Sequence, residues 1–155
     1  MQKKNVLISG CLLGLDCRYD GGNNYIEEIE KLKEAVNLIP VCPEQLGGLT
    51  TPRQPSEIRE GNVISKTGAD VTAEYEKGAC EALKLAQLLG CTCAILKARS
   101  PSCGSGVIYD GTFSKTKIPG DGKAAALLKA NGIRVYTELE LEEFWSQEQH
   151  MQMTG

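Results

Sequence analysis

Four short apolar runs alternate with amphipathic stretches along the 155 residues of this chain. This alternation is typical of repeated βα units, in which buried parallel strands lie between helices. We predict core strands over residues 4–9, 37–41, 92–97 and 134–136, and helices over residues 25–35, 73–89, 122–130 and 138–149. The sequence therefore predicts a single α/β domain spanning residues 1–155, with a Rossmann-like three-layer architecture and a mostly parallel sheet.

The segments between these elements are rich in glycine and proline. Residues 43–55 contain too many helix-breaking residues for a long helix. We expect a hairpin formed by residues 62–65 and 70–72, a short strand over residues 107–109 and a loop over residues 113–119. Thr72 and Asp121 are predicted helix caps. Residues 150–155 are expected to form a frayed tail.

Charge and composition exclude several classes of protein. The net charge is −3, no basic run is present, and the chain has only two phenylalanines and one tryptophan, so nucleic-acid binding is not expected. No apolar run approaches the ~20 residues of a membrane span, and the first apolar run is too short for a signal peptide. We therefore expect a cytoplasmic protein, whose seven cysteines stay reduced and serve metal binding or catalysis.

Three cysteines follow predicted strands directly or within a short loop. Cys11 follows the first strand, Cys42 the second and Cys103 the third. Loops at the carboxyl edge of neighbouring parallel strands converge on one crevice, so these thiols are expected to meet there. Three thiolates without a fourth ligand indicate a metal centre with one open coordination position. Three unrelated buried thiols remain the alternative that spacing alone does not exclude.

The other cysteines are less promising metal ligands. Cys91 and Cys93 lie where the third strand begins, roughly 13–17 Å from its carboxyl edge, and are expected to be core residues. Cys80 is assigned to the apolar face of a helix, whereas Cys17 lies in the loop after the first strand and is a candidate accessory thiol. The only histidine, His150, lies in the expected tail, so a histidine-containing zinc site is not indicated, although zinc bound by the three cysteines remains open.

The cysteine-containing motifs together resemble the thiouracil desulfidase family, which was long classed as a domain of unknown function. The resemblance covers nearly the whole chain. It is carried by SGCLLG at 9–14, RYDG at 18–21, VCPE at 41–44, GGL at 47–49, PRQPSEI at 52–58 and LKARSPSCG at 96–104.

This resemblance implies a [4Fe–4S] cluster held by Cys11, Cys42 and Cys103, with Glu44 and Ser100 as catalytic residues. It also implies an enzyme that converts thiolated nucleobases, such as 2- or 4-thiouracil, into their oxo forms with release of sulfide. The open iron would bind the substrate sulfur, and no net redox change would be needed.

The residues themselves are compatible with these roles and with simpler ones. Glu44 suits a general base that activates water, but acidic residues are also common at helix starts. Ser100 precedes a proline, and serine before proline is also common in turns, so a purely structural role explains it as well. Ser102 is the second candidate for the catalytic role of Ser100. The candidate substrate-binding residues are Tyr19, Asp20 and Arg53. Tyr19 and Asp20 are equally compatible with a simple β-turn, and Arg53 is also compatible with a surface cation. Lys97 and Arg99 are candidate counter-charges for a cluster.

Two other functions remain open at this point. One is a sulfur transferase acting on tRNA, against which the acidic balance of the chain argues. The other is a non-catalytic metal-binding or redox module. The expected partner is a small thiolated nucleobase rather than a nucleic acid or a membrane, and we expect a monomer or a weak homodimer.

Overall fold

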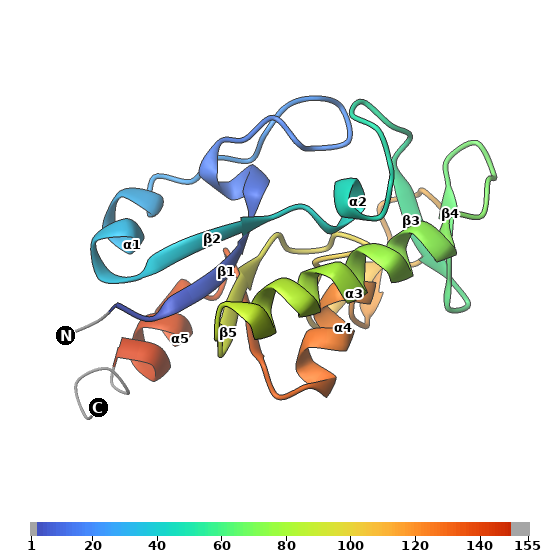
Figure 1. Cartoon of the computed structure of the whole chain (residues 1–155). Coiled ribbons are helices and arrows are strands. Elements are labelled where there is room, and N and C mark those ends of the chain that lie inside the picture. The colour runs from blue at the N-terminus through green and yellow to red at the C-terminus, as the bar shows by residue number, and fades with distance from the viewer. Residues whose placement is uncertain (1–2, 150–155) are drawn as a thin grey trace.

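The computed structural model describes residues 3–149 and contains a four-stranded parallel sheet (Figure 1). The strand order is β2-β1-β5-β8, with β1 at Asn5–Ser9, β2 at Asn37–Val41, β5 at Cys93–Leu96 and β8 at Arg134–Thr137. These strands lie within one residue of the predicted ends, so the predicted parallel core is confirmed. Pro40 lies on β2, an edge strand, where a missing N–H group disrupts the ladder least.

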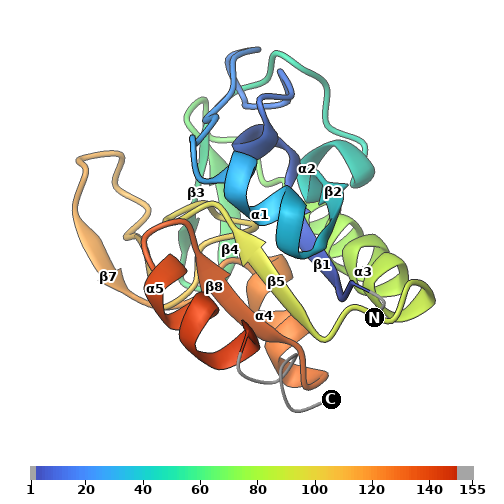
Figure 2. The ribbon, with the colours of Figure 1, turned by 90° about the vertical axis from the view of Figure 1, so that its left-hand side faces the viewer.

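Helices cover both faces of this sheet and give three layers (Figure 2). In β1, Val6 and Ile8 pack into the cluster that includes residues of α1 (Ile29–Ala35) and α5 (Leu141–Phe144). Leu7 points to the opposite face, against α3 (Thr72–Leu88) and α4 (Lys123–Ala130). All three side chains are fully buried, as expected for a strand covered on both faces.

The helices differ from the prediction mainly at their ends. The first begins at residue 29 rather than 25, and the last divides into α5 and a π-helical turn at Trp145–Gln149. Two short helices follow strands directly, a 3₁₀ turn at Gly10–Leu13 and α2 at Pro43–Leu46. No helix in residues 3–149 combines the length and apolar character that crossing a bilayer requires.

Two predicted caps have other roles. The Thr72 hydroxyl accepts a hydrogen bond from the Val63 N–H, and it is Asp70 that accepts one from the Thr72 N–H. Asp121 accepts from the Gly106 N–H and from Lys129 rather than from an N–H in the first turn of α4. Both predictions failed because the competing partners are distant in sequence.

The predicted hairpin of residues 62–65 and 70–72 is wrong in its main partner. Strand β4 (Asn62–Ser65) pairs along its length with β3 (Ser56–Arg59), which the sequence analysis missed. Both residues of the connecting turn, Glu60 and Gly61, have positive φ, as the twist of a two-residue hairpin requires. The 62–65 segment meets the 70–72 segment at only one bridge, Ile64 to Asp70.

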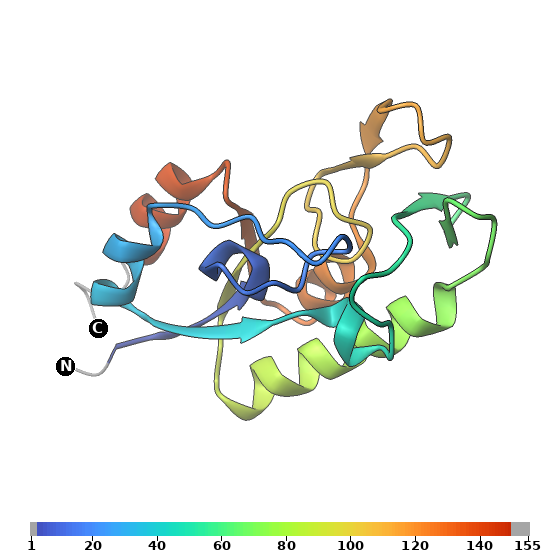
Figure 3. The ribbon, with the colours of Figure 1, turned by 90° about the horizontal axis from the view of Figure 1, so that it is seen from above.

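A second hairpin contains another strand that the prediction missed. Strand β6 (Val107–Tyr109) is confirmed, but it pairs with β7 (Lys117–Pro119), where we had predicted a loop. All three residues of β7 are exposed, so no apolar alternation marks it in the sequence. Figure 3 shows both hairpins, green and orange, beyond the carboxyl ends of the sheet strands.

The order of the strands defines where a site is expected. The connection after β1 leads to α1 on one face, whereas those after its neighbours β2 and β5 lead to helices on the other face. Neighbouring strands whose connections diverge in this way leave a crevice at their carboxyl ends.

Candidate metal centre and its pocket

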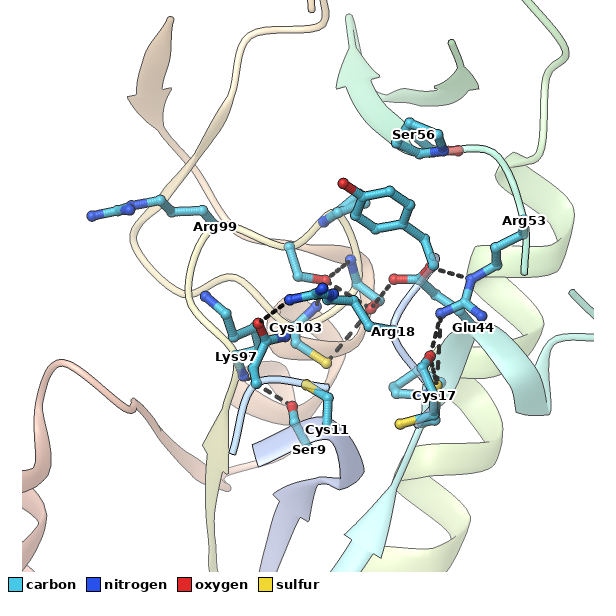
Figure 4. A pocket seen from close by; sticks show the side chains of 18 of the residues that line it. Ser9, Cys11, Cys17, Arg18, Glu44, Arg53, Ser56, Lys97, Arg99 and Cys103 are labelled. Atoms are coloured by element: carbon cyan, nitrogen blue, oxygen red, sulfur yellow. Dashed lines mark hydrogen bonds and ion pairs between the residues drawn. The ribbon is translucent and has the colours of Figure 1, made fainter. Parts of the chain in front are cut away.

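A pocket of about 610 Å³ lies at the carboxyl ends of the sheet strands (Figure 4). Every residue for which the sequence suggested a site role lines it, together with Cys17. These residues are Cys11, Tyr19, Asp20, Cys42, Glu44, Arg53, Lys97, Arg99, Ser100, Ser102 and Cys103. The structure therefore brings the whole candidate set to one place, although what each residue does there is a separate question.

Three adjacent strands deliver the three cysteines. Cys11 lies in the 3₁₀ turn after β1, Cys42 immediately precedes α2 after β2, and Cys103 lies in the loop after β5. Burial raises the pKa of Cys11, and it raises the pKa of Cys103 to about 12. Without a metal these two thiols hold their protons at neutral pH, so metal binding must release protons.

The pocket offers three thiols as a donor set for a metal group. Within residues 3–149, no group of three His, Cys, Asp or Glu side chains is arranged to hold one metal ion. Thiolates on a single zinc each lie within ~2.3 Å of it and so crowd together. In an iron–sulfur cluster each thiolate binds a different iron, which spreads the sulfurs apart. Three thiols that share one pocket are a donor set that an iron–sulfur cluster accepts, since such clusters are held by cysteine thiolates.

The remaining cysteines differ in burial and in distance from the pocket. Cys91 and Cys93 are buried at the start of β5, as predicted. Cys80 is exposed, so its assignment to the core was wrong. The buried face of α3 follows Tyr75, Ala79, Ala82 and Ala86, and a residue directly after Ala79 turns about 100° away from that face.

Cys17 lies inside the pocket and is almost fully buried. Burial and the neighbouring Cys42 raise its pKa to about 12. Its backbone carbonyl accepts a hydrogen bond from the Cys42 thiol, with an S–O distance of 3.7 Å. Cys17 is therefore a direct neighbour of a candidate ligand.

Glu44 and Arg53 form a buried ion pair beside the cysteines (Figure 4). Glu44 lies in the first turn of α2, and its Oε1 accepts a hydrogen bond of 2.8 Å from Arg53 Nε. The two side chains are 14% and 6% exposed, so solvent screens their attraction only weakly.

The guanidinium of Arg53 is fully engaged with protein groups. A guanidinium has five N–H groups. Beyond Glu44, those of Arg53 are directed at the Thr50 carbonyl, the Thr51 hydroxyl, the Cys17 carbonyl and, at 4.0 Å, the Cys42 sulfur. Arg53 therefore holds Glu44 and the loop after α2 in a fixed relation to each other.

Two serines continue the polar chain from Glu44. Ser102 Oγ lies 3.1 Å from Glu44 Oε2 and 3.0 Å from Ser100 Oγ. Because an ionised carboxylate only accepts, Ser102 donates to Glu44 and accepts from Ser100. Ser100 Oγ also accepts from the N–H groups of Ser102 and Cys103, so it fixes the turn that carries Cys103.

Tyr19 and Asp20 lie on the more exposed side of the pocket. Two hydrogen bonds from Arg18 and one from the Gly22 N–H lower the pKa of Asp20 to about 2. The Tyr19 carbonyl accepts a hydrogen bond of 2.7 Å from the Arg53 N–H, which ties this turn to the loop after α2. The β-turn expected here is present, and its side chains still line the pocket.

Comparison with known proteins assigns the family. A family model described as 2-thiouracil desulfurase matches residues 6–140. The chain belongs to the 2-thiouracil desulfurase family. It is 45% identical over 148 residues to the uncharacterized protein YbbK of Bacillus subtilis strain 168, covering 89% of this chain and 98% of that one.

Similarity to a solved structure supports the same family assignment. The [4Fe–4S]-dependent thiouracil desulfidase TudS superposes with a TM-score of 0.86 and is 43% identical to this chain. The match covers 91% of this chain and 95% of that one. The predicted resemblance and the predicted α/β fold are thus both confirmed.

Two residues at or next to the pocket were not predicted from the sequence: Tyr75, which lines it, and Glu138, which pairs with the lining residue Lys97. Tyr75 of α3 lines it and is 1% exposed, and burial together with Glu44 raises its pKa. In sequence Tyr75 is one apolar position of an amphipathic helix, so no local signal points to the pocket. Glu138, just after β8, pairs with Lys97 at 2.8 Å and accepts from the Ala98 N–H. Its place after a core strand was the available signal.

Proposed function

We propose that this protein is an iron–sulfur-dependent desulfidase of the cytoplasm that hydrolyses thiolated nucleobases such as 2- or 4-thiouracil. Membership of the 2-thiouracil desulfurase family and similarity to TudS support this proposal. The observation that carries it is the buried carboxylate of Glu44 in the same pocket as three thiols from three adjacent strands.

Cys11, Cys42 and Cys103 are the residues that would hold a [4Fe–4S] cluster. Such a cluster, bound by three thiolates, supplies an iron with an open position that is able to bind the thiocarbonyl sulfur and polarise the C–S bond. Of the described cysteines, only these three and Cys17 line the pocket.

We assign to Glu44 the role of general base that activates the attacking water molecule. It would accept a proton as the water oxygen attacks the carbon that carries sulfur. The balance is thiocarbonyl plus water giving carbonyl plus hydrogen sulfide, so no electron donor or acceptor is needed. Arg53 holds Glu44 Oε1, and Ser102 donates to Oε2, so both carboxylate oxygens are oriented before substrate arrives.

The serines and the turn at Tyr19 would complete the substrate site. Ser100 and Ser102 offer a hydroxyl relay that returns the proton from Glu44 toward the departing sulfur or the ring. Tyr19, which is 43% exposed, is placed to stack on the ring, while Asp20 has one oxygen engaged only by Arg18 and is able to accept a ring N–H. We assign Arg53 to holding Glu44, because its five N–H groups already have acceptors.

A pocket of about 610 Å³ is in the size range of small-molecule sites. We therefore propose a free nucleobase or a small thiolated derivative as the substrate, acted on by a monomer or a weak homodimer. Filter binding at low salt tests the tRNA alternative, because phosphate contacts are strongest there.

Anaerobic cluster reconstitution followed by a sulfide-release assay with 2- and 4-thiouracil tests the proposal. We expect Cys11→Ala, Cys42→Ala and Cys103→Ala to lose iron. Glu44→Gln should keep its iron but lose at least ~100-fold in kcat, the usual range for a general base. Glu76→Gln, an exposed change of the same kind on α3, is the matched control.

Two outcomes would contradict this function. Full activity in Glu44→Gln would remove Glu44 as the base. A wild-type protein that binds the cluster but releases no sulfide from either base would instead be a metal-binding or redox module.

A further inference from the structure

The two hairpins contribute residues to the pocket, and the proposed reaction gives these residues no role. We propose that Phe113, in the loop between β6 and β7, is a specificity-determining residue that packs against the planar ring of the substrate, and that Glu57 of β3 positions it. This inference rests on the proposed function, because it concerns how the same pocket recognises a thiolated nucleobase.

The hairpins form the outer wall of the pocket. They lie beyond the carboxyl ends of the sheet strands, whereas the three candidate ligand cysteines follow those ends (Figure 3). Strand β3 contacts β6, and one bridge joins Ile108 of β6 to Arg99 in the loop after β5. The pocket-lining residues in or beside the hairpins are Ser56, Glu57, Lys66, Tyr109, Phe113 and Lys115. A ring bound with its sulfur toward the cysteines therefore extends toward the hairpins.

The loop between β6 and β7 has an unusual backbone. Gly111, Phe113 and Lys115 have positive φ angles of 95°, 57° and 66°. Glycine adopts such angles without strain, but for a bulky residue such as phenylalanine they are costly. Strained conformations of this kind persist only where neighbouring groups fix them, and they concentrate at binding and catalytic sites. We therefore expect contacts from outside the loop to hold Phe113.

Strand β3 supplies those contacts. Glu57 Oε1 accepts hydrogen bonds of 3.1 Å from both the Gly111 N–H and the Phe113 N–H. Arg59, two residues further along the strand and so on the same face, donates to the Gly111 carbonyl at 2.7 Å from Nη2 and at 3.2 Å from Nε. A Cβ atom on Gly111 would lie 2.7 Å from Arg59 Cβ, so only glycine allows this approach. Glu57 thus fixes the backbone at Phe113 itself.

The loop has a polar side and an aromatic side. Thr112, Ser114 and Thr116 are exposed, and their hydroxyl groups are linked in a chain with oxygen–oxygen distances of 2.5 and 2.8 Å. The Asp110 N–H donates to the Thr116 carbonyl at 3.0 Å and closes the loop. Phe113 is half-buried and lines the pocket. The loop therefore directs its hydroxyl groups to solvent and its one aromatic ring to the pocket.

An aromatic ring on this wall suits a flat heterocycle. Nucleobases stack on aromatic side chains because every base has a π face. The thiols and Glu44 are assigned to the sulfur and the reacting carbon, whereas Phe113 would recognise the ring itself. A contact that is equally strong in the bound substrate and in the transition state lowers KM and leaves kcat unchanged. Phe113 should therefore act on KM.

The kinetics of sulfide release from 2-thiouracil by the reconstituted protein test Phe113. We expect Phe113→Ala to raise KM at least about 5-fold, the lower range for loss of base stacking, with kcat and iron content unchanged. Phe113→Tyr keeps an aromatic ring and should keep the wild-type KM. Ile118→Ala is the control, because Ile118 is an exposed apolar residue of the same hairpin that is not among the pocket-lining residues.

Glu57 has a test that includes a readout independent of activity. Glu57→Gln keeps an accepting oxygen and should behave like wild type. Glu57→Ala should raise KM as Phe113→Ala does, and it should speed trypsin cleavage after Lys115, because the loop is no longer held. The double variant of Glu57→Ala with Phe113→Ala should have the KM of Phe113→Ala alone, since Glu57 acts through Phe113. Exposed Glu76→Ala is the control.

Thermal unfolding of each cluster-free variant shows whether it is folded. A folded Phe113→Ala protein with the wild-type KM would overturn the inference, while sulfide release by wild type leaves the proposed function intact. Additive increases of KM in the double variant, or unchanged trypsin cleavage in Glu57→Ala, would remove Glu57 as the positioning residue. A wild-type protein that binds the cluster but releases no sulfide would end both proposals.

Discussion

Ser102 lies at the centre of the polar chain that ends on Glu44. It is 1% exposed and contacts Glu44, Ser100 and Cys103 through one hydroxyl group. Ser100 has a different position, because two backbone N–H groups of the Cys103 loop donate to it. At the scale of single residues, two neighbouring serines therefore differ in what their loss should do.

We expect Ser102→Ala to keep its iron and lose about 5-fold in kcat, since one hydrogen bond contributes about 1 kcal/mol. Ser100→Ala should instead lose iron during purification, because the turn that carries Cys103 is no longer fixed. Iron analysis and sulfide release measured together separate the two effects, with exposed Ser146→Ala as the control. Equal iron content and equal activity in both variants would refute the distinction.

At the scale of elements, the site depends on how closely α2 and α3 approach. A Cβ atom on Gly78 of α3 would lie 1.8 Å from the Pro43 carbonyl oxygen, and one on Gly47 would lie 1.9 Å from the Glu74 carbonyl oxygen. These contacts are between backbone atoms, so no side-chain rotation relieves them. Because Pro43 lies between Cys42 and Glu44, the glycines allow α3 to support the segment that carries both groups.

We predict that Gly78→Ala lowers the free energy of unfolding by about 3 kcal/mol, the upper range for overpacking. It should also weaken iron binding, since α2 must move away from α3. Urea unfolding and iron analysis check this result. Cys80→Ala, two residues further along the same helix but exposed, should leave both quantities unchanged. A Gly78→Ala protein as stable as wild type would show that the two helices are free to separate.

At the scale of the whole molecule, Glu148 joins both ends of the described chain to the sheet. This carboxylate is 2% exposed and accepts hydrogen bonds from Lys4 at 2.7 Å, from Arg134 Nη2 at 2.8 Å and from Tyr136 at 2.8 Å. Burial alone would raise its pKa, but the bonds from Arg134, Lys4 and Tyr136 outweigh burial and lower the pKa to about 2. Folding therefore favours the ionised form of Glu148.

The sign of the pH dependence follows from this shift. The unfolded chain binds a proton at Glu148 near the ordinary pKa of 4.5, whereas the folded chain does so only near 2. The stabilisation is complete above 4.5 and disappears as the pH falls toward 2. We expect Glu148→Gln to lower the free energy of unfolding at pH 7 by about 2 kcal/mol and to lose part of the acid sensitivity.

Urea unfolding between pH 7 and pH 2 measures this effect. Exposed Glu143→Gln is the matched control and should follow wild type at every pH. If wild type and Glu148→Gln lose stability in parallel as the pH falls, Glu148 is not the group responsible.

The sequence by itself determined the four core strands and the cysteines that end three of them. A strand buried on both faces is a local run of apolar residues, so β1 and β5 are predictable from their own residues alone. The family motifs added Glu44 and the serines for the same reason, since each motif is continuous in the chain. The role of each of these residues stays a prediction until the experiments above are done.

Only the tertiary structure decided which polar groups form hydrogen bonds with which partners and which side chains are buried. The exposed strand β7, the pairing of β4 with β3 and the exposure of Cys80 depend on contacts that no local pattern records. The same is true of Arg53, whose five donors find acceptors from residue 17 to residue 51, and of Tyr75, a core position that borders the pocket. Hydrogen bonding and burial are properties of neighbours in space, and the chain specifies those neighbours only once it is folded.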